Sequence, residues 1–120
     1  MDDPGSDNQQ YDLEERTARF GEAIIAFAGT VKVDDITSPL VRQLVPAATS
    51  VGANYCEADE VGTKKEFEYR ISVCKRDSRE TKYWLRMIAK AWPVGKRQAR
   101  GLWKQPNELT RIFARIHRSS

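Results

Sequence analysis

The sequence predicts an all-α protein, an up-down-up-down four-helix bundle over residues 11–118. Three observations support this fold class. Four stretches repeat apolar residues at alternating steps of three and four, the connections between them are short, and no stretch alternates apolar and polar residues as a strand would. The 120 residues are enough for one domain. Residues 1–10 are polar and acidic, and we expect them to form a disordered tail.

The first helix is predicted from about Tyr11 to Lys32. Its core-facing positions follow one another at helical spacing and are Leu13, Thr17, Phe20, Ile24, Phe27 and Val31. A second ridge of mostly small side chains would let another helix approach closely. This ridge consists of Ala18, Gly21, Ile25 and Ala28.

The second helix is predicted to open with Ser38 as its N-cap and Pro39 at its first position. Its core-facing positions are Leu40, Leu44, Ala47, Val51, Asn54 and Ala58, and an adjacent apolar ridge is formed by Val41, Val45, Ala48, Gly52 and Tyr55. A helix with two apolar ridges is either central or covered by another subunit. Pro46 lies inside the helix, so we expect a bend there.

The third helix is the longest, from Thr63 to Ala91. Thr63 and Glu66 have the spacing of a capping box at its start, and the pair Trp92-Pro93 ends it, because proline disfavours the helical conformation of the residue before it. Its core-facing positions are Phe67, Ile71, Cys74, Ser78, Thr81, Leu85 and Ile88.

The fourth helix is predicted from about Arg97 to His117, with a kink at Pro106. The alternative is a shorter helix that begins at Pro106, but Leu102 and Trp103 would then have no place on a helix. The core-facing positions are Ala99, Leu102, Pro106, Leu109, Phe113 and Ile116.

The two halves of the chain carry opposite charge. Residues 1–60 hold four Lys and Arg against twelve Asp and Glu, a net charge of −8, whereas residues 61–120 hold sixteen against five, a net charge of +11. This separation indicates an anionic partner or a self-complementary assembly.

The basic residues of the second half form two ridges at helical spacing. Like charges at this spacing destabilise a helix by about 0.2–0.5 kcal/mol a pair, so an anion outside the helix should compensate them. It could be nucleic-acid phosphate, with Trp103, Trp92 or Tyr83 stacking on bases, or the acidic first half of a neighbouring subunit. The predicted nucleic-acid-binding residues are Lys75, Arg79, Lys82, Arg86 and Lys90 on the third helix and Arg97, Arg100, Lys104, Arg111 and Arg115 on the fourth.

No pattern of residues indicates a metal site, a cofactor or catalysis. A di-metal site in a four-helix bundle needs Glu-x-x-His pairs, in which a glutamate stands three residues before a histidine. The residue three positions before His117 is Ala114, so the pair is absent. The sequence contains neither a G-x-S-x-G motif nor a glycine-rich phosphate loop. We therefore predict a protein that is not an enzyme and needs no metal or cofactor.

Four polar residues of the second and third helices are predicted to have a structural role and not a catalytic one. Asp77 and Glu80 could form an acid–base pair, but polar groups inside a bundle more often fix helix register. We expect Asn54, Glu57, Asp77 and Glu80 to form such a polar layer.

The sequence indicates neither secretion nor membrane insertion. Residues 1–10 lack the apolar segment of a signal peptide, and no apolar run approaches the roughly 20 residues that a membrane span requires. Cys56 and Cys74 are predicted to be unpaired, as in a reducing compartment. We expect a cytoplasmic protein without membrane contact.

Three strings of residues carry a resemblance to a known family. They are DLEERTARFGEAII at 12–25, QLVPAATSVGANYCEAD at 43–59 and KKEFEYRISVCKRDSRETKYWLRMI at 64–88. They resemble the bacterial four-helix bundle proteins known as 23S rRNA intervening-sequence proteins. The most specific parts are Ser50-x-x-x-Asn54-x-x-Glu57-Ala58 and Glu80-x-x-x-Trp84-Leu85.

The resemblance implies homopentameric rings of up-down bundles and no catalytic residues. A related branch of the family is the accessory protein of diversity-generating retroelements, a basic pentameric barrel that binds nucleic acid and a reverse transcriptase.

Together the residues and the resemblance predict a ring-forming, non-enzymatic bundle that binds nucleic acid, RNA foremost, through its basic ridges. The alternative is an oligomeric scaffold that binds a protein partner such as a reverse transcriptase, with the ridges solvated or paired inside the ring.

Overall fold

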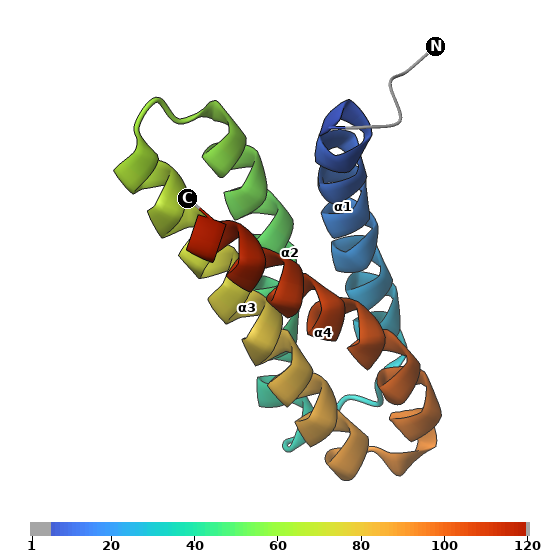
Figure 1. Ribbon diagram of the computed structural model, residues 1–120. Helices are drawn as coiled ribbons and strands as arrows, with labels where there is room; N and C mark the ends of the chain where they lie inside the picture. The colour runs from blue at the N-terminus through green and yellow to red at the C-terminus, as the bar shows by residue number, and fades with distance from the viewer. Residues whose placement is uncertain (1–5, 120) are drawn as a thin grey trace.

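All four predicted helices are present. The structure, a computed structural model, describes the backbone of residues 6–119 and the side chains of residues 13–119. Within this range it contains four α-helices and one short 3-10 helix and no strand: α1 (Ser6–Thr30), α2 (Thr37–Glu60), α3 (Lys64–Ala91), η1 (Pro93–Gly95) and α4 (Lys96–Ser119). The predicted four-helix bundle is therefore confirmed. Figure 1 shows α2 and α3 running antiparallel, with α1 packed beside α2 and α4 packed against α3.

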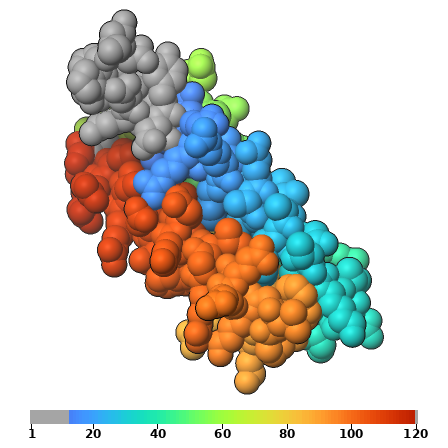
Figure 2. Space-filling model, turned by 90° about the vertical axis from the view of Figure 1, so that its right-hand side faces the viewer, coloured from blue at the N-terminus to red at the C-terminus, as the bar shows by residue number. Residues whose placement is uncertain are grey.

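The bundle is closed by contacts between its first and last helices. Figure 2 shows α1 and α4 next to each other on one face. Arg16 on α1 donates from Nε to Gln105 Oε1 at 2.9 Å and from Nη2 to Glu108 Oε1 at 3.0 Å on α4. These contacts are exposed and polar, whereas the buried side chains of all four helices form one apolar cluster.

The core is made by the positions that the helical spacing predicted. The side chains with no more than 1% of their surface exposed include Ile24 and Phe27 on α1, Leu44 and Val51 on α2, Ile71, Leu85 and Ile88 on α3, and Leu109 and Phe113 on α4. At about 25 cal/mol per Å² of apolar surface buried, these side chains supply the main favourable term of folding.

The buried hydroxyl groups of Thr17, Ser78 and Thr81 bond within their own helices. Thr17 donates to Leu13 O at 2.7 Å, Ser78 donates to Cys74 O at 2.8 Å, and Thr81 donates to Asp77 O at 2.7 Å. Each hydroxyl bonds to its own helix four residues back, so burial leaves none of them unsatisfied. Their small side chains leave room for close packing of neighbouring helices.

Helix α1 begins earlier than predicted, at Ser6 instead of Tyr11, and it ends at Thr30. Residues 6–10 of the predicted disordered tail thus belong to the helix, and residues 1–5 lie outside the described part of the chain.

The prediction that Ser38 caps α2 is wrong, because α2 begins at Thr37, after Ile36 at the N-cap position, and the side chain that bonds to the backbone at this start is Asp34. The Asp34 carboxylate accepts from the backbone N–H groups of Ile36 and Thr37, each at 2.8 Å, and Thr37 Oγ1 accepts from the backbone N–H of Asp34 at 3.0 Å. The hydrogen bonds from Thr37 and Ile36 hold the pKa of Asp34 below its usual value. This reciprocal arrangement places Asp34, not Ser38, at the start of the helical turn.

The start of α3 matches the prediction in one of its two hydrogen bonds. Thr63 Oγ1 accepts from the backbone N–H of Glu66 at 3.1 Å, as an N-cap does. The Glu66 carboxylate does not reach back to Thr63 and lies 3.7 Å from Arg70 instead. Glu66 thus pairs with Arg70, one turn further along α3, and does not make the second hydrogen bond of a capping box.

Both internal prolines lie within unbroken helices. Helix α4 runs from Lys96 to Ser119 through Pro106, which confirms the long fourth helix and rules out a start at Pro106. Helix α2 likewise continues through Pro46. The bend at Pro46 and the kink at Pro106 both stay predictions.

Trp92 ends α3 and anchors the turn to α4. The Trp92 ring packs against Phe27 of α1, with ring centroids 6.4 Å apart. A Cβ added to Gly95 would lie 2.3 Å from the Trp92 ring and 3.4 Å from Phe27 Cε1. Only a residue without a side chain fits at this position while Trp92 stays on the core.

We expect Gly95→Ala to lower the free energy of unfolding by about 1–3 kcal/mol, because the added methyl group overpacks the Trp92 contact. Urea unfolding followed by circular dichroism measures this. The matched control is Gly101→Ala on α4, where an added Cβ meets nothing within 4 Å. This control should raise the stability by about 0.5–1 kcal/mol. Equal stability of Gly95→Ala and wild type would show that Trp92 does not fix the turn.

Candidate nucleic-acid interface

Helix α3 presents its basic residues beside α4. Burial of Ile71, Cys74, Ser78, Thr81, Leu85 and Ile88 fixes the rotation of the helix about its axis. The predicted basic ridge then lies along the flank of α3. Arg79, Arg86 and Lys90 are exposed, and Lys75 and Lys82 are half-buried.

Helix α4 presents its basic residues to solvent. Its buried side is formed by Ala99, Pro106, Leu109 and Phe113. The predicted residues Arg97, Arg100, Lys104, Arg111 and Arg115 are all exposed.

The two helices enclose a groove near the turn that joins them. It has a volume of about 600 Å³ and is lined by Leu85, Arg86, Ala89 and Lys90 of α3, by Pro93, and by Lys96, Ala99, Arg100 and Trp103 of α4. Four of these side chains are cationic and none of the described lining residues is acidic. The groove therefore combines an apolar floor with positively charged walls. Figure 1 shows where α3 and α4 run side by side toward η1, which is the part of the bundle that holds this groove.

Trp103, an exposed aromatic residue of the groove lining, contacts a lysine of α3. Lys82 Nζ lies 5.2 Å from the centroid of the Trp103 ring and donates to Asn107 Oδ1 at 3.2 Å. The cation–π contact and the hydrogen bond together hold the Lys82 ammonium between Trp103 and Asn107, which lies one turn further along α4. Trp103 is 39% exposed and lines the groove, whereas Lys82 does not.

The basic residues are not neutralised inside the subunit. Among the side chains of residues 13–119, the cations that form ion pairs are Arg16, Arg19, Arg70 and Arg76, and none of these belongs to the two ridges. The positive potential of α3 and α4 is therefore available to a partner.

Three of the ten predicted residues line the groove, namely Arg86, Lys90 and Arg100. Lys82 is not part of the lining but contacts Trp103. The remaining six, Lys75, Arg79, Arg97, Lys104, Arg111 and Arg115, lie elsewhere on α3 and α4. The ridges are thus a broad basic surface that contains one concave site.

Sequence reasoning missed Lys96 as a site residue. The predicted fourth helix begins at about Arg97 and so leaves Lys96 out. In the structure η1 ends at Gly95 and α4 begins at Lys96, so Lys96 stands one turn before Arg100 on the groove wall. Its spacing of four residues from Arg100 could have revealed it.

Of the three aromatic residues considered for stacking, only Trp103 lines the groove. Trp92 is half-buried against Phe27. Tyr83 is 54% exposed but packs edge-on against Trp84, with ring centroids 5.0 Å apart.

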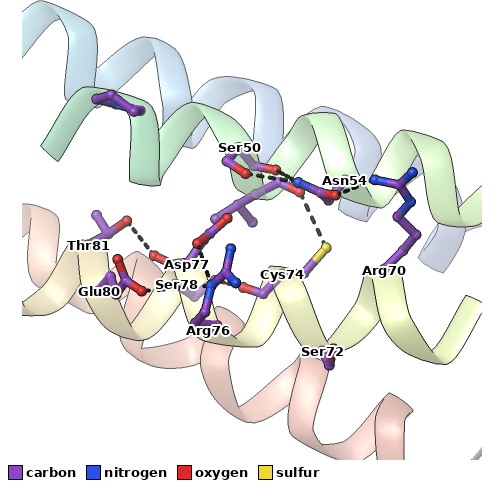
Figure 3. A network of polar contacts seen from close by, with 12 residues as sticks. Ser50, Asn54, Arg70, Ser72, Cys74, Arg76, Asp77, Ser78, Glu80 and Thr81 are labelled. Atoms are coloured by element: carbon purple, nitrogen blue, oxygen red, sulfur yellow. Dashed lines mark hydrogen bonds and ion pairs between the residues drawn. The ribbon is translucent and has the colours of Figure 1, made fainter. Parts of the chain in front are cut away.

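The predicted polar layer between α2 and α3 is only partly formed. Asn54 Oδ1 accepts from Arg70 Nη1 at 3.0 Å, and Asn54 Nδ2 donates to Ser50 Oγ at 2.8 Å. Figure 3 shows the Asn54 amide between Ser50 on its own helix and Arg70 on α3. Asn54 therefore links the two helices, as predicted.

The acidic members of that layer behave differently. Asp77 is buried and pairs with Arg76 Nε at 3.2 Å, but Glu57 and Glu80 are exposed, which corrects the prediction that they belong to a buried layer. Glu80 lies 3.7 Å from Arg76 at the surface. Helical spacing in the sequence predicted that Glu57 and Glu80 lie near the interface between α2 and α3. The rotation of each helix about its axis in the structure leaves both side chains facing solvent.

We expect Asn54→Ala to lower the free energy of unfolding by about 1–3 kcal/mol, because the substitution leaves the partly buried Arg70 guanidinium without its acceptor on α2. Thermal melting followed by circular dichroism measures the loss. Glu80→Ala serves as the control and should change the stability by no more than about 0.5 kcal/mol, since Glu80 is exposed. A larger loss for Glu80→Ala than for Asn54→Ala would contradict this assignment.

The described residues also bear on nucleophilic and metal chemistry. Cys56 and Cys74 are both free. Cys74 is fully buried, which raises its pKa to about 12, so its thiol is protonated at neutral pH. Among the side chains of residues 13–119, no three or more His, Cys, Asp or Glu residues gather closely enough to hold a metal ion.

Within the described chain no helix has the length and apolar character that crossing a bilayer requires.

A second, smaller hollow lies between α1 and α2. It has a volume of about 300 Å³ and is lined by Glu14, Thr17, Ala18, Gly21, Glu22, Ile25, Thr49, Gly52, Ala53 and Cys56. Its lining includes three of the four residues of the ridge predicted for close helix approach, Ala18, Gly21 and Ile25. Ile25 is 51% exposed at this hollow.

Comparison with known proteins gives a structural likeness only. No family model matches the chain, and no curated protein matches it. A crystal structure of a protein of unknown function from the S23 ribosomal protein family of Bacteroides thetaiotaomicron is similar, with a TM-score of 0.76 and 17% sequence identity. The alignment covers 88% of this chain and 97% of that one. At this identity the likeness establishes the fold, which is a four-helix bundle like that of an S23 ribosomal family protein.

Proposed function

We propose that this protein is a non-enzymatic, ring-forming subunit that binds nucleic acid, RNA foremost, through the basic surface of α3 and α4. One observation carries the proposal. The cations of this surface lack ion-pair partners among the described side chains, and four cations surround a groove lined by no described carboxylate. A surface of this kind has a strong attraction for polyanions.

The shape of the surface suits a phosphate backbone. Lys75 to Lys90 spans about 22 Å along α3 at 1.5 Å per residue, which is enough to follow several phosphates in a row. The described elements include no reading module for base edges, so binding with little sequence preference is expected.

RNA is the first ligand to test for two reasons. The sequence resembles 23S rRNA intervening-sequence proteins, and the structural neighbour is described as a member of a ribosomal protein family. We propose that the chain belongs with these proteins and acts in the cytoplasm.

Assembly into a ring, with five subunits favoured by the resemblance, forms part of the same proposal. The hollow between α1 and α2 offers a floor of small residues, an exposed Ile25 and the acidic side chains Glu14 and Glu22. A neighbouring subunit could cover it by close helix packing.

The second candidate is an oligomeric scaffold for a protein partner such as a reverse transcriptase. The acidic residues at the α1–α2 hollow favour it, because they could neutralise the basic ridges of a neighbour within the ring. In that case nucleic acid would bind weakly or not at all.

We expect the double charge reversal Arg86→Glu with Arg100→Glu to weaken RNA binding at least tenfold. Each lost phosphate contact should also reduce the slope of log affinity against log salt, by about 0.9 on duplex and about 0.7 on single strands. Fluorescence anisotropy with labelled RNA and DNA across a salt series measures both quantities.

The control reverses the same number of charges away from the groove. Lys64→Glu with Lys65→Glu changes two exposed residues in the first turn of α3, at the far end of the helix. Acidic residues suit a helix N-terminus, so this variant should stay folded and should bind almost as wild type. If both double variants weakened RNA binding equally, RNA would be attracted by the net charge of the protein and not by a site in the groove. Unchanged binding by the groove variant would make the protein scaffold the leading function.

Light scattering should give a mass that is a multiple of 13.7 kDa, and five times that value would match the ring. Ile25→Arg should lower the mass, because a charge would enter the packed α1–α2 hollow. The control Val33→Arg alters another exposed apolar residue, 81% exposed in the connection between α1 and α2 and outside the hollow. A wild-type monomer at micromolar concentration would reject the ring.

A further inference from the structure

The groove between α3 and α4 contains more than phosphate binding requires. A phosphate site needs cations, but this groove also has an apolar floor of Leu85, Ala89 and Ala99 and an exposed indole at one end. We propose that the groove holds an unpaired nucleotide of a single strand, with its base stacked on Trp103 and its phosphates on the surrounding cations. This inference rests on the proposed function and specifies its ligand.

The Trp103 side chain is 39% exposed and lines the groove, and Lys82 Nζ lies over its ring, 5.2 Å from the centroid. Lys82 contacts both Trp103 and Asn107, which stands one turn further along α4, while the groove extends from Trp103 in the opposite direction, toward Arg100 and Lys96. Lys82, which is not part of the groove lining, therefore reaches the indole from the direction of Asn107, and the exposed part of Trp103 remains for a base that enters the groove. A base entering the groove would then meet an indole that already contacts the Lys82 ammonium.

The contact with Lys82 also prepares the ring for stacking. Because Asn107 fixes the ammonium at 3.2 Å, the cation–π contact restricts the orientation of the Trp103 side chain before any ligand arrives. Less side-chain freedom is then lost on binding, which increases affinity.

The charges are placed for the phosphates of the same nucleotide and its neighbours. Arg86 and Lys90 stand on the α3 wall, and Lys96 and Arg100 stand on the α4 wall. A strand lying in the groove would thus meet positive side chains from both helices. The groove volume of about 600 Å³ is within the range of about 300–1,000 Å³ typical of sites for small molecules.

This arrangement favours a single strand over a duplex. In a duplex the bases are paired and stacked on one another, so their faces are not available to an indole, whereas an unpaired base offers one. The outer ridges of α3 and α4 can attract either form by charge alone. Trp103 should therefore contribute to single-strand binding only.

The test compares wild type with Trp103→Ala and Trp103→Phe, using labelled oligoadenylate of about 20 nucleotides and the matching oligoadenylate–oligouridylate duplex. Loss of stacking should weaken single-strand binding about 5- to 100-fold in Trp103→Ala, with an unchanged salt slope, and should leave duplex binding unaltered. Trp103→Phe retains an aromatic face and should bind the single strand more tightly than Trp103→Ala. Circular dichroism checks that each variant is folded.

The control is Tyr83→Ala, which removes an exposed aromatic residue of α3 that does not line the groove. It should bind both probes as wild type does. A separate titration with adenosine monophosphate distinguishes a strand from a free nucleotide, and affinity for the mononucleotide equal to that for the strand would overturn the assignment.

Two results separate this inference from the function on which it rests. If wild type binds both probes and Trp103→Ala binds both with equal loss or with no loss, the stacking site is rejected while nucleic-acid binding stands. If wild type binds neither probe at low salt, nucleic-acid binding itself is rejected.

Discussion

The buried seam of α3 is the constraint on which the rest of the structure depends. Ile71, Cys74, Ser78, Thr81, Leu85 and Ile88 are at most 1% exposed, and α3 packs against both α2 and α4. Because this seam fixes the rotation of the helix, it also fixes where each flank points. One flank turns Arg70 toward Asn54 on α2, and the other places Arg86 and Lys90 beside α4. Packing and charge placement thus have the same cause.

The basic surface works against folding, and the core compensates for it. Like charges at helical spacing cost about 0.2–0.5 kcal/mol a pair, whereas full burial of one Leu or Ile contributes about 1.5–3 kcal/mol. A few apolar side chains therefore offset the repulsion within both ridges. The cations of this surface have no ion-pair partner among the described side chains, so an anionic partner would relieve their repulsion. The few contacts between α1 and α4, in which Arg16 binds Gln105 and Glu108, add little to this core.

The candidate site arises from the turn that joins α3 and α4. Trp92 leaves the helical conformation before Pro93 and packs on Phe27, and Gly95 allows the chain to pass close to the Trp92 ring. Helix α4 can then begin at Lys96 and run back along α3, which brings Lys96 and Arg100 opposite Arg86 and Lys90. A break in one helix and an aromatic contact to the core therefore determine the geometry of the groove.

Helical periodicity in the sequence determined the four helices, their buried faces and the two basic ridges, because a spacing of 3.6 residues per turn is a local property. Local reasoning failed at helix ends, as at Ser38, where a better cap from Asp34 was available. Only the tertiary structure decided which cations converge, that Glu57 and Glu80 face solvent, and that Trp103 borders the groove while Trp92 enters the core. These outcomes depend on the rotation and register of one helix against another, and packing between distant residues sets both.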